Sequence, residues 1–285
     1  MERYYHLYSS PLKNTPLFRK DEDKVYFLNR IAICRISFKF NVYAYVLMDN
    51  HVHFLVSGES SVILAAFNEI KRIFAKYLAN TTGVVAIDID DFSVSLRPIN
   101  GEDDFKSVVA YILRNPLKAG LGSPMNYYWS SCFLYFNPWL RYFPVKTAKE
   151  YGAVKIRTNI KTRAALPDKY TFLDDMIFPG SWCLFKKVEQ LFGRSVDLFC
   201  LLNIRTTEQD EEGKIEGVER NTYTDGQLMA KVDEYCKING VDKISELTVT
   251  ELRSLITLSH KRWGASKKQV KRILGASDSD INRFY

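Results

Sequence analysis

The sequence has few cysteines, and they lack the spacings that cysteine chemistry uses. Five cysteines occur in 285 residues, and no two of them form a CxxC pair. The odd number and the wide spacing argue against a disulfide framework and against a cysteine-based zinc or redox motif. We therefore expect reduced core cysteines, as in a cytosolic protein.

Long apolar runs are also absent. No stretch approaches the roughly 20 apolar residues that span a bilayer, and the first residues, MERYYHLYSS, lack the apolar segment of a secretory signal. The sequence predicts a cytoplasmic protein with no membrane partner. No internal repeat is present, which excludes solenoid architectures.

The composition that remains is that of a globular protein with excess positive charge. Hydrophobic residues make up 46% and charged residues 26% of the chain, and the net charge is +7. The isoelectric point is about 9.0. This favours a polyanionic partner, although a mildly basic protein without such a partner has the same composition.

Periodicity predicts an α+β catalytic domain over residues 1–145. Apolar residues alternate in the predicted strands and recur at helical spacing in the predicted helices. The order strand, helix, strand, strand, helix, strand is the split βαβ pattern of a ferredoxin-like antiparallel sheet. The expected elements are strands at 4–9, 41–48 and 51–57, helices at 21–36 and 61–80, a β-rich stretch at 84–99, and a helix from Asp103-Asp104 that ends at Asn115-Pro116.

Three further regions follow the predicted catalytic domain. Residues 146–205 are expected to form a helical extension whose role the sequence does not indicate. The acidic, glycine-containing residues 206–222 read as a linker. Residues 223–285 are expected to form helices at 225–239, 250–263, 266–274 and 278–285.

His51 and His53 lie one residue apart in the stretch YVLMDNHVHFLV. Because side chains alternate faces along a strand, both imidazoles project to one face while Val52, Phe54 and Val56 face the core. Two imidazoles on one face can bind one cation, and they can equally be exposed or hydrogen-bonded histidines. A metal site needs a third ligand.

The predicted helix DFKSVVAYILRN offers that ligand and a nucleophile. Tyr111 and Asn115 lie four residues apart, on the side opposite the apolar face of the helix. A metal held by two imidazoles and an amide oxygen keeps open positions for a substrate phosphate, which a tyrosine could attack. A tyrosine at the helix surface is the alternative. Arg114 and Lys118 flank these positions and are candidates for holding a DNA backbone. His6, in the first predicted strand, could face the site, although the sequence favours a structural histidine.

Six blocks occur in order between about residues 4 and 136: YYHLY, PLF with DEDKVYFLNR, AYVLMDNHVHFLV, AFNEIKRIFAKYLAN, VVAYILRNPLKAGL and NYYWSSCFLY. Together these blocks resemble the REP-associated tyrosine transposases of the single-tyrosine HUH superfamily. Two departures stand out: Asp49 replaces the usual proline before the histidines, and residues 84–96 lack the family's usual approach to the next strand.

The resemblance implies an HUH endonuclease fold and a DNA transposase that nicks and rejoins single-stranded DNA near hairpins. It makes His51 and His53 the metal pair, Asn115 the third ligand and Tyr111 the nucleophile that forms a 5′-phosphotyrosine. It points to Mg²⁺ or Mn²⁺ as the metal, to single-stranded DNA with hairpins as the partner, and to a nucleoid-associated location. Two alternatives stay open: a domesticated hairpin-binding protein that does not cut, and a metal-dependent nuclease that uses water. The sequence does not decide between a monomer and a homodimer.

Residues 266–285, SKKQVKRILGASDSDINRFY, have the spacing of a helix-turn-helix, with Gly275 at the turn. This segment resembles the helix-turn-helix at the end of some such transposases, and a small basic helical cap is the alternative. A helix-turn-helix would also bind duplex stem DNA. The expected DNA contacts are Lys267, Lys268 and Arg272 to phosphates, and Asn282 and Arg283 to the major groove.

Overall fold

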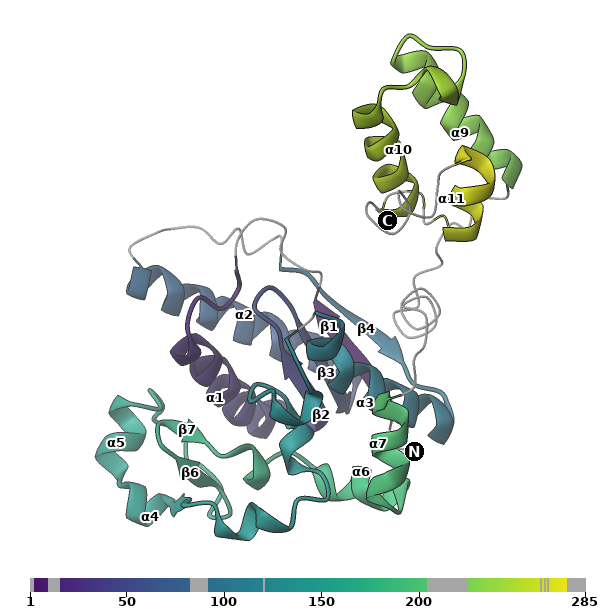
Figure 1. The fold of residues 1–285 in the computed structure, drawn as a ribbon. Coiled ribbons are helices and arrows are strands. Elements are labelled where there is room, and N and C mark those ends of the chain that lie inside the picture. Colours follow the sequence, from purple (N-terminus) through teal and green to yellow (C-terminus); the bar gives the residue numbers. More distant parts are fainter. Residues whose placement is uncertain are drawn as a thin grey trace. The chain divides into compact units, whose positions relative to one another are not determined.

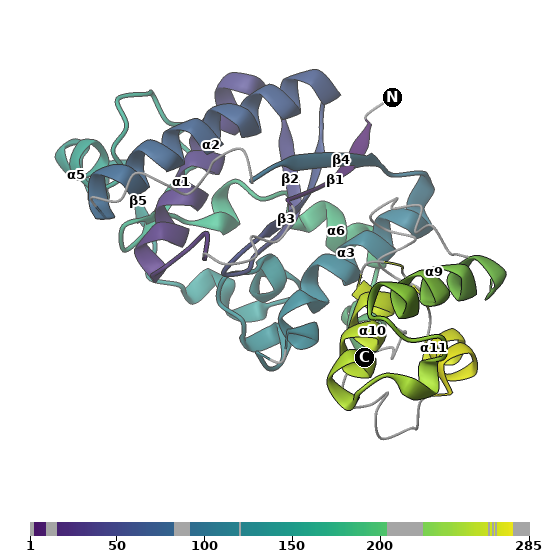
Figure 2. The same ribbon diagram turned by 90° about the horizontal axis from the view of Figure 1, so that it is seen from above.

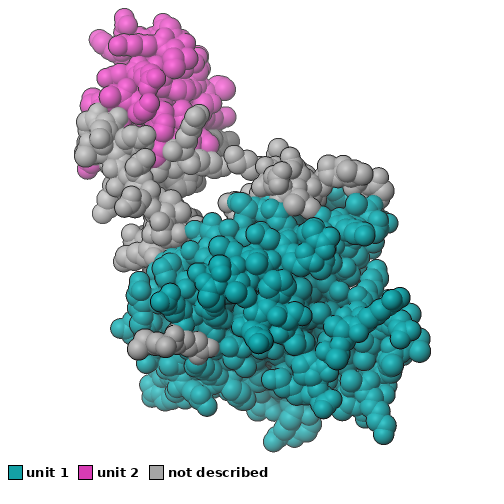
Figure 3. Space-filling model, turned by 180° about the vertical axis from the view of Figure 1, so that it is seen from behind, with its two compact units in different colours: residues 1–205 teal, residues 206–285 magenta. Residues whose placement is uncertain are grey.

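The chain forms two compact units, residues 1–205 and residues 206–285 (Figure 3). A computed structural model describes residues 3–9, 16–82, 92–119, 121–203, 225–261, 263, 265 and 267–275. The linker predicted at 206–222 lies outside the described residues. The predicted boundary between residues 145 and 146 falls inside the first unit and stays a prediction.

The first unit is built on a four-stranded antiparallel sheet with the strand order β2-β3-β1-β4. Strands and helices follow one another in the predicted order, which confirms an α+β fold with several helices around one antiparallel sheet. The elements are β1 (Tyr4–Ser9), α1 (Asp21–Phe38), β2 (Asn41–Leu47), β3 (Val52–Ser57), α2 (Ser60–Thr82), β4 (Val94–Pro98) and α3 (Gly101–Lys118).

The sheet separates two helical layers, with α1 and α2 on one face and α3 on the other (Figures 1 and 2). Alternation along β3 explains this arrangement. Val52, Phe54 and Val56 are fully buried in the large apolar core that includes α1 and α2. His53 points to the other face, where its ring meets Tyr111 of α3. The strand therefore places apolar side chains in the core and His53 on the opposite face, as predicted, and that face is covered by α3.

Helix α3 continues through Pro116 to Lys118, so the predicted end at Asn115-Pro116 is wrong. Proline lacks the N–H that would bond to the carbonyl four residues earlier, which is that of Ile112. The side-chain amide of Asn115 supplies a donor instead: its Nδ2 lies 3.3 Å from Ile112 O and 3.0 Å from Tyr111 O. The helix thus keeps its carbonyls bonded across the proline.

Residues 146–205 contain helices and also a small three-stranded sheet, β5-β6-β7, that the sequence did not predict. Strands of two or three residues are too short to show periodicity. The segment packs on α1, where Asn29 Nδ2 donates to Asp175 O and Asn29 Oδ1 accepts from Ile177 N. Its elements are β5 (Lys146–Thr147), α4 (Ala148–Tyr151), α5 (Ala153–Thr158), β6 (Thr171–Leu173), β7 (Met176–Ile177), η5 (Pro179–Ser181), α6 (Phe185–Phe192) and α7 (Ser195–Asn203).

Three short 3-10 helices connect α3 to this segment. They are η2 (Pro124–Asn126), η3 (Ser131–Leu134) and η4 (Pro138–Tyr142). Between them, Trp129 O accepts a hydrogen bond from Leu47 N at 2.8 Å, and Tyr135 Oη donates to Tyr43 O at 2.7 Å. Residues 129–135 therefore run along β2, and Trp129 and Tyr135 are buried.

The second unit has its own apolar core. Leu228, Val232, Leu255, Ile256 and Val270 are buried in it. Its elements are α9 (Asp225–Ile238), η6 (Ile244–Glu246), α10 (Val249–Lys261) and α11 (Lys267–Leu274). Gly275 follows α11 with a φ of 63°, a backbone conformation that suits glycine at a helix end. The helix predicted at 278–285, and with it the helix-turn-helix, lies outside the described residues. In the described part of the chain, no helix is both long and apolar enough to cross a membrane.

Candidate active site

Two histidines on neighbouring strands lie beneath α3. His53 of β3 pairs in register with Tyr8 of β1, and His6 lies two residues before Tyr8 on the same strand face. His6 Nε2 is 3.0 Å from His53 Nδ1, so the two rings share one hydrogen bond. The side chains are 0% and 3% exposed respectively. Tyr111 of α3 meets both rings edge-on, with centroids at 5.6 Å from His6 and 5.5 Å from His53.

His51 lies just before β3, and its two ring nitrogens face two asparagines. Nδ1 is 2.7 Å from Asn50 Oδ1, and since a carbonyl oxygen only accepts, Nδ1 carries the proton and donates. Nε2 is 3.5 Å from Asn115 Oδ1. The amide of Asn115 is oriented by Nδ2, which donates to carbonyls of α3, so Oδ1 is the atom that faces His51.

In neutral His51, therefore, a nitrogen lone pair faces an oxygen lone pair. Burial lowers the pKa of His51 below its usual 6.5, although the contact with Asn115 opposes this shift. A neutral imidazole and an amide oxygen at this separation fit a shared divalent cation, because both atoms are ligands that such cations accept. Among the described residues, no group of three or more histidine, cysteine, aspartate or glutamate side chains is arranged to hold a metal. A metal here would thus depend on the Asn115 amide.

His53 is held in the neutral form more strongly than His51. Burial lowers its pKa well below 6.5, and the neighbouring His6, His51 and Lys118 lower it further by charge repulsion. Its Nδ1 is engaged with His6, which leaves Nε2 as the nitrogen for a cation. Neutral imidazole is the form that binds metals.

Tyr111 is 3% exposed, so the alternative of a tyrosine at the helix surface is wrong. Lys118, two turns along α3, places its Nζ 4.3 Å from the centroid of the Tyr111 ring. The four predicted residues His51, His53, Tyr111 and Asn115 are therefore brought together on one side of the sheet, with Lys118 beside them. Their chemical roles stay predictions.

Asp49 does not extend this group of side chains. Its carboxylate forms an ion pair with Lys24 of α1 at 2.7 Å, and Lys24 also lies over the ring of Trp129. The backbone carbonyl of Asp49 accepts a hydrogen bond from Phe18 N at 3.0 Å. The carboxylate of Asp49 is thus paired on the α1 side of the turn.

The residues predicted to contact DNA differ in their exposure, and some of them lie outside the described residues. Arg114 is only 7% exposed, so its guanidinium is not displayed on the surface. Arg272 is exposed on α11. The side chains of Lys267 and Lys268, and the whole of Asn282 and Arg283, lie outside the described residues. These DNA contacts stay predictions.

His6 is the residue of this site for which the sequence favoured a structural role and left open a position facing the site. The available signal was positional: in YHLYS, His6 and Tyr8 share one strand face, and antiparallel pairing with the HVH strand brings that face beside His53. Pairing between strands that are far apart in sequence is what a single sequence does not display.

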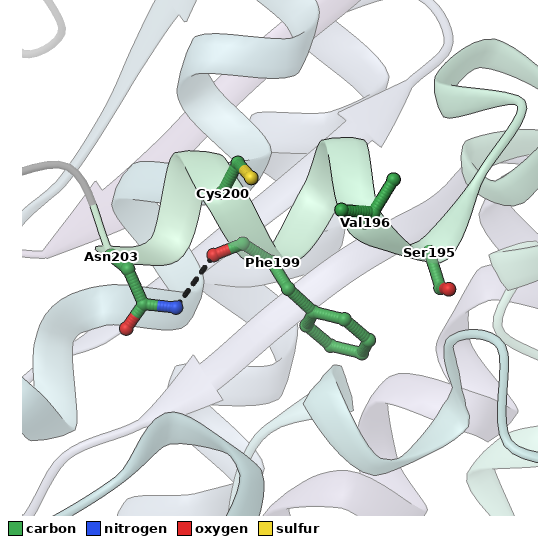
Figure 4. A pocket seen from close by; sticks show the side chains of 5 residues that line it. All are labelled: Ser195, Val196, Phe199, Cys200 and Asn203. Carbon is green, nitrogen blue, oxygen red and sulfur yellow. Dashed lines mark hydrogen bonds between the residues drawn. The ribbon is translucent and has the colours of Figure 1, made fainter.

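A separate hollow of about 550 Å³ lies on α7 (Figure 4). It carries no charged side chain, and the amide of Asn203 is occupied with Phe199 O at 2.8 Å. It therefore brings no charged group to a ligand, and it is not part of the candidate active site. Its lining residues are Ser195, Val196, Phe199, Cys200 and Asn203.

Comparison with known proteins gives one distant structural likeness. No protein-family model and no curated protein matches the chain. Among solved structures, the chain is similar to a REP-associated tyrosine transposase bound to a REP hairpin, with 16% sequence identity. The match covers 47% of this chain and 77% of the other, with a TM-score of 0.37. At this level the comparison indicates a distant structural relationship and does not assign an activity.

Proposed function

We propose that this protein nicks and rejoins single-stranded DNA at hairpin-forming sequences, with Tyr111 as the nucleophile and Mg²⁺ or Mn²⁺ as the metal. The observation that carries the proposal is the position of Asn115. Its Oδ1 faces His51 Nε2, while one helical turn earlier Tyr111 lies against His53. A phenol, two neutral imidazoles and an amide oxygen at one place are more than a binding surface needs.

The metal would be held by His51, His53 and Asn115. When bound, a divalent cation supplies charge stabilisation for the phosphate oxygens that become more negative during attack. His51 keeps its Nε2 lone pair because Asn50 accepts the Nδ1 proton. His6 would do the same for His53 by accepting from Nδ1 through its own Nε2. Asn115 offers Oδ1 because its Nδ2 is bonded to the α3 backbone.

The proposed reaction is a balanced exchange of phosphate esters. The Tyr111 oxygen attacks the phosphorus of a DNA phosphodiester, an O–P bond to tyrosine forms, and the P–O3′ bond breaks. The phenol loses its proton and the leaving 3′ oxygen gains one, so no co-reactant is consumed. Because the number of ester bonds is unchanged, a 3′-OH can attack the phosphotyrosine and rejoin the strand.

One observation favours a second candidate function. Tyr111 is 3% exposed, so little of its side chain is accessible to a phosphodiester. A protein that binds hairpins without cutting would not need an accessible phenol. The second candidate is therefore a non-cutting hairpin-binding protein.

A covalent protein–DNA adduct distinguishes the nicking enzyme from the non-cutting hairpin-binding protein. The wild-type chain, mixed with Mg²⁺ or Mn²⁺ and single-stranded hairpin oligonucleotides from the flanks of its own gene, is expected to retain labelled DNA on a denaturing gel. His51→Ala should abolish the adduct while hairpin binding remains measurable in a native gel. Binding without an adduct in the wild type would support the non-cutting candidate.

A further inference from the structure

We infer that Trp139, Arg141 and Tyr142 of η4 form a stacking platform for unpaired DNA bases. These three residues, called the η4 platform below, stand out by exposure: Trp139 is 68% and Tyr142 is 62% exposed. Large aromatic side chains are normally buried to a high degree, and exposure of two of them three residues apart leaves much apolar surface in water. Such a surface is typical of a binding site.

The backbone of the platform is anchored by the residues directly before and after η4. Asn137 precedes η4, and its Oδ1 accepts from Trp139 N at 2.9 Å while its Nδ2 donates to Phe133 O at 2.8 Å. Phe143, directly after η4, packs its ring against those of Phe133 and Phe178. The backbone that carries the platform is therefore anchored, and binding would require little ordering of the chain.

The geometry of the three side chains suits stacked bases. The rings of Trp139 and Tyr142 lie 5.8 Å apart at an angle of 43°. The Arg141 guanidinium lies 4.8 Å from the centroid of the Tyr142 ring. Aromatic faces stack on any base, and an arginine beside them can meet a phosphate or add a cation–π contact.

The charge of the surrounding chain favours a nucleic acid over a protein as the partner of the platform. Trp, Tyr and Arg are also frequent in protein interfaces. However, residues 105–149 contain no aspartate or glutamate and six basic residues. Arg114 is buried and Lys106 is paired with Glu102 at 2.6 Å, so the positive charge of this stretch comes from Lys118, Arg141, Lys146 and Lys149. Glu189 of α6 contacts this stretch at Phe136 N, and its charge is compensated by Lys186 at 2.8 Å. An acid-free stretch with exposed aromatics favours single-stranded nucleic acid.

The chain that leads into the platform starts beside the candidate active site. Trp129 O accepts from Leu47 N, at the end of β2 that adjoins His51, and Tyr135 Oη donates to Tyr43 O, four residues back along β2. Residues 129–135 therefore run about 13 Å along the sheet before the chain enters η4.

The inference rests on the proposed function only for the nature of the ligand, and it is tested without cutting. Full-length Tyr111→Phe protein in a metal chelator is titrated into short fluorescein-labelled oligothymidine, and anisotropy gives the affinity. Adding Trp139→Ala should weaken binding about 5-fold to 150-fold, the range for loss of one stacked base. Trp139→Phe should retain most of the affinity. Arg141→Ala should reduce the dependence of binding on salt.

Two controls make the test specific. Val154→Ala, at an apolar residue 76% exposed in the same unit, should leave the affinity unchanged. Binding of a blunt-ended DNA duplex, which has no unpaired bases, should not respond to Trp139→Ala. Equal oligothymidine affinity with and without Trp139→Ala would overturn the inference, and so would an equal loss of affinity for the blunt-ended duplex. A Trp139-dependent affinity in a protein whose wild type forms no adduct would keep the platform and overturn the proposed nicking.

Discussion

At the scale of single residues, the proton in the His6–His53 hydrogen bond decides whether His53 can bind a cation. If His53 Nδ1 donates, Nε2 keeps a lone pair for a metal. If His6 Nε2 donates instead, neutral His53 carries its proton on Nε2 and cannot be a ligand. The 3.0 Å contact is compatible with both arrangements. Only the first one agrees with the proposed metal site.

We predict that His53 in the metal-free protein carries its proton on Nδ1, and that His6→Phe disturbs this preference. Loss of such a supporting partner typically costs about 10-fold to 100-fold in metal affinity. Nitrogen-15 NMR of the imidazoles gives the tautomer, and calorimetry with Mn²⁺ gives the affinity. Tyr8→Phe, on the same strand face, serves as the control. An Nε2-protonated His53 in the wild type would contradict the assignment.

The buried imidazoles also predict how stability depends on pH. The pKa values of His51 and His53 are lowered by burial, whereas in the unfolded chain both lie near 6.5. Below about pH 6.5 the unfolded chain binds protons that the folded chain does not, so the free energy of unfolding falls as the pH drops towards the lowered values. When the pH is lowered from about 7 to about 5, the free energy of unfolding should fall less in His53→Asn than in the wild type. The difference should be about 1.4 kcal/mol for each pKa unit by which folding lowers the pKa of His53 within this pH range. Denaturant unfolding in a chelator measures this, and equal losses would refute it.

The sequence was sufficient to predict those parts of the site that depend on the local geometry of one strand or one helix. Alternation along a strand puts His51 and His53 beside each other, and helical spacing puts Tyr111 and Asn115 one turn apart. It did not predict the burial of Arg114, because helical spacing does not show which later elements pack on that side of α3. The sequence left the position of His6 open, because its contact with His53 depends on pairing between residues 47 positions apart.

At the scale of elements, α3 continues past Pro116 because a side-chain hydrogen-bond donor replaces the backbone N–H that proline lacks. The Asn115 amide bonds to Ile112 O, which no backbone N–H at position 116 can reach. The same bond orients Oδ1 towards His51. The residue proposed as a metal ligand therefore also repairs the helix that carries the nucleophile.

We predict that Asn115 and Pro116 are energetically coupled. Asn115→Ala should lower stability because it leaves Ile112 O without a donor, whereas in a Pro116→Ala background a backbone N–H takes its place. The coupling should be about 1 kcal/mol, the net value of one hydrogen bond. Unfolding of the two single variants and the double variant gives this number. Asn203→Ala is the control, because it removes a comparable amide-to-carbonyl hydrogen bond in α7. The stability changes of Asn203→Ala and Pro116→Ala should be additive. If the stability changes of Asn115→Ala and Pro116→Ala were also additive, the proposed replacement of the backbone donor by the Asn115 amide would be wrong.

The fold was predictable wherever elements are long. Strands β1 to β3 and helices α1 to α3 bury repeated apolar positions, so their periods appear in the sequence. The sheet of β5, β6 and β7 has strands of only two or three residues, and its position is set by contacts such as those of Asn29 with Asp175 and Ile177. These contacts join residues about 150 positions apart, which no local pattern reveals.

At the scale of the whole molecule, the second unit is proposed to bind duplex DNA separately from cutting. Its last helices carry much of the excess positive charge of the chain: residues 250–285 contain eight Lys and Arg against three Asp and Glu. Deletion of residues 220–285 should weaken binding to the paired stem of a hairpin and flatten its salt dependence. The truncated protein should still nick a short single-stranded oligonucleotide at high enzyme concentration. Unchanged affinity and salt slope would favour a structural cap.

The central claim is that the phenol of Tyr111 becomes bonded to DNA. The direct measurement is a denaturing gel of wild-type protein and Tyr111→Phe with labelled single-stranded hairpin DNA and Mn²⁺, followed by peptide mapping of any adduct. The account predicts an adduct at Tyr111 in the wild type and none in Tyr111→Phe, because phenylalanine keeps the ring in its place against His53 and removes only the oxygen. Undiminished adduct in Tyr111→Phe, or cleavage by the wild type without any adduct, would contradict it.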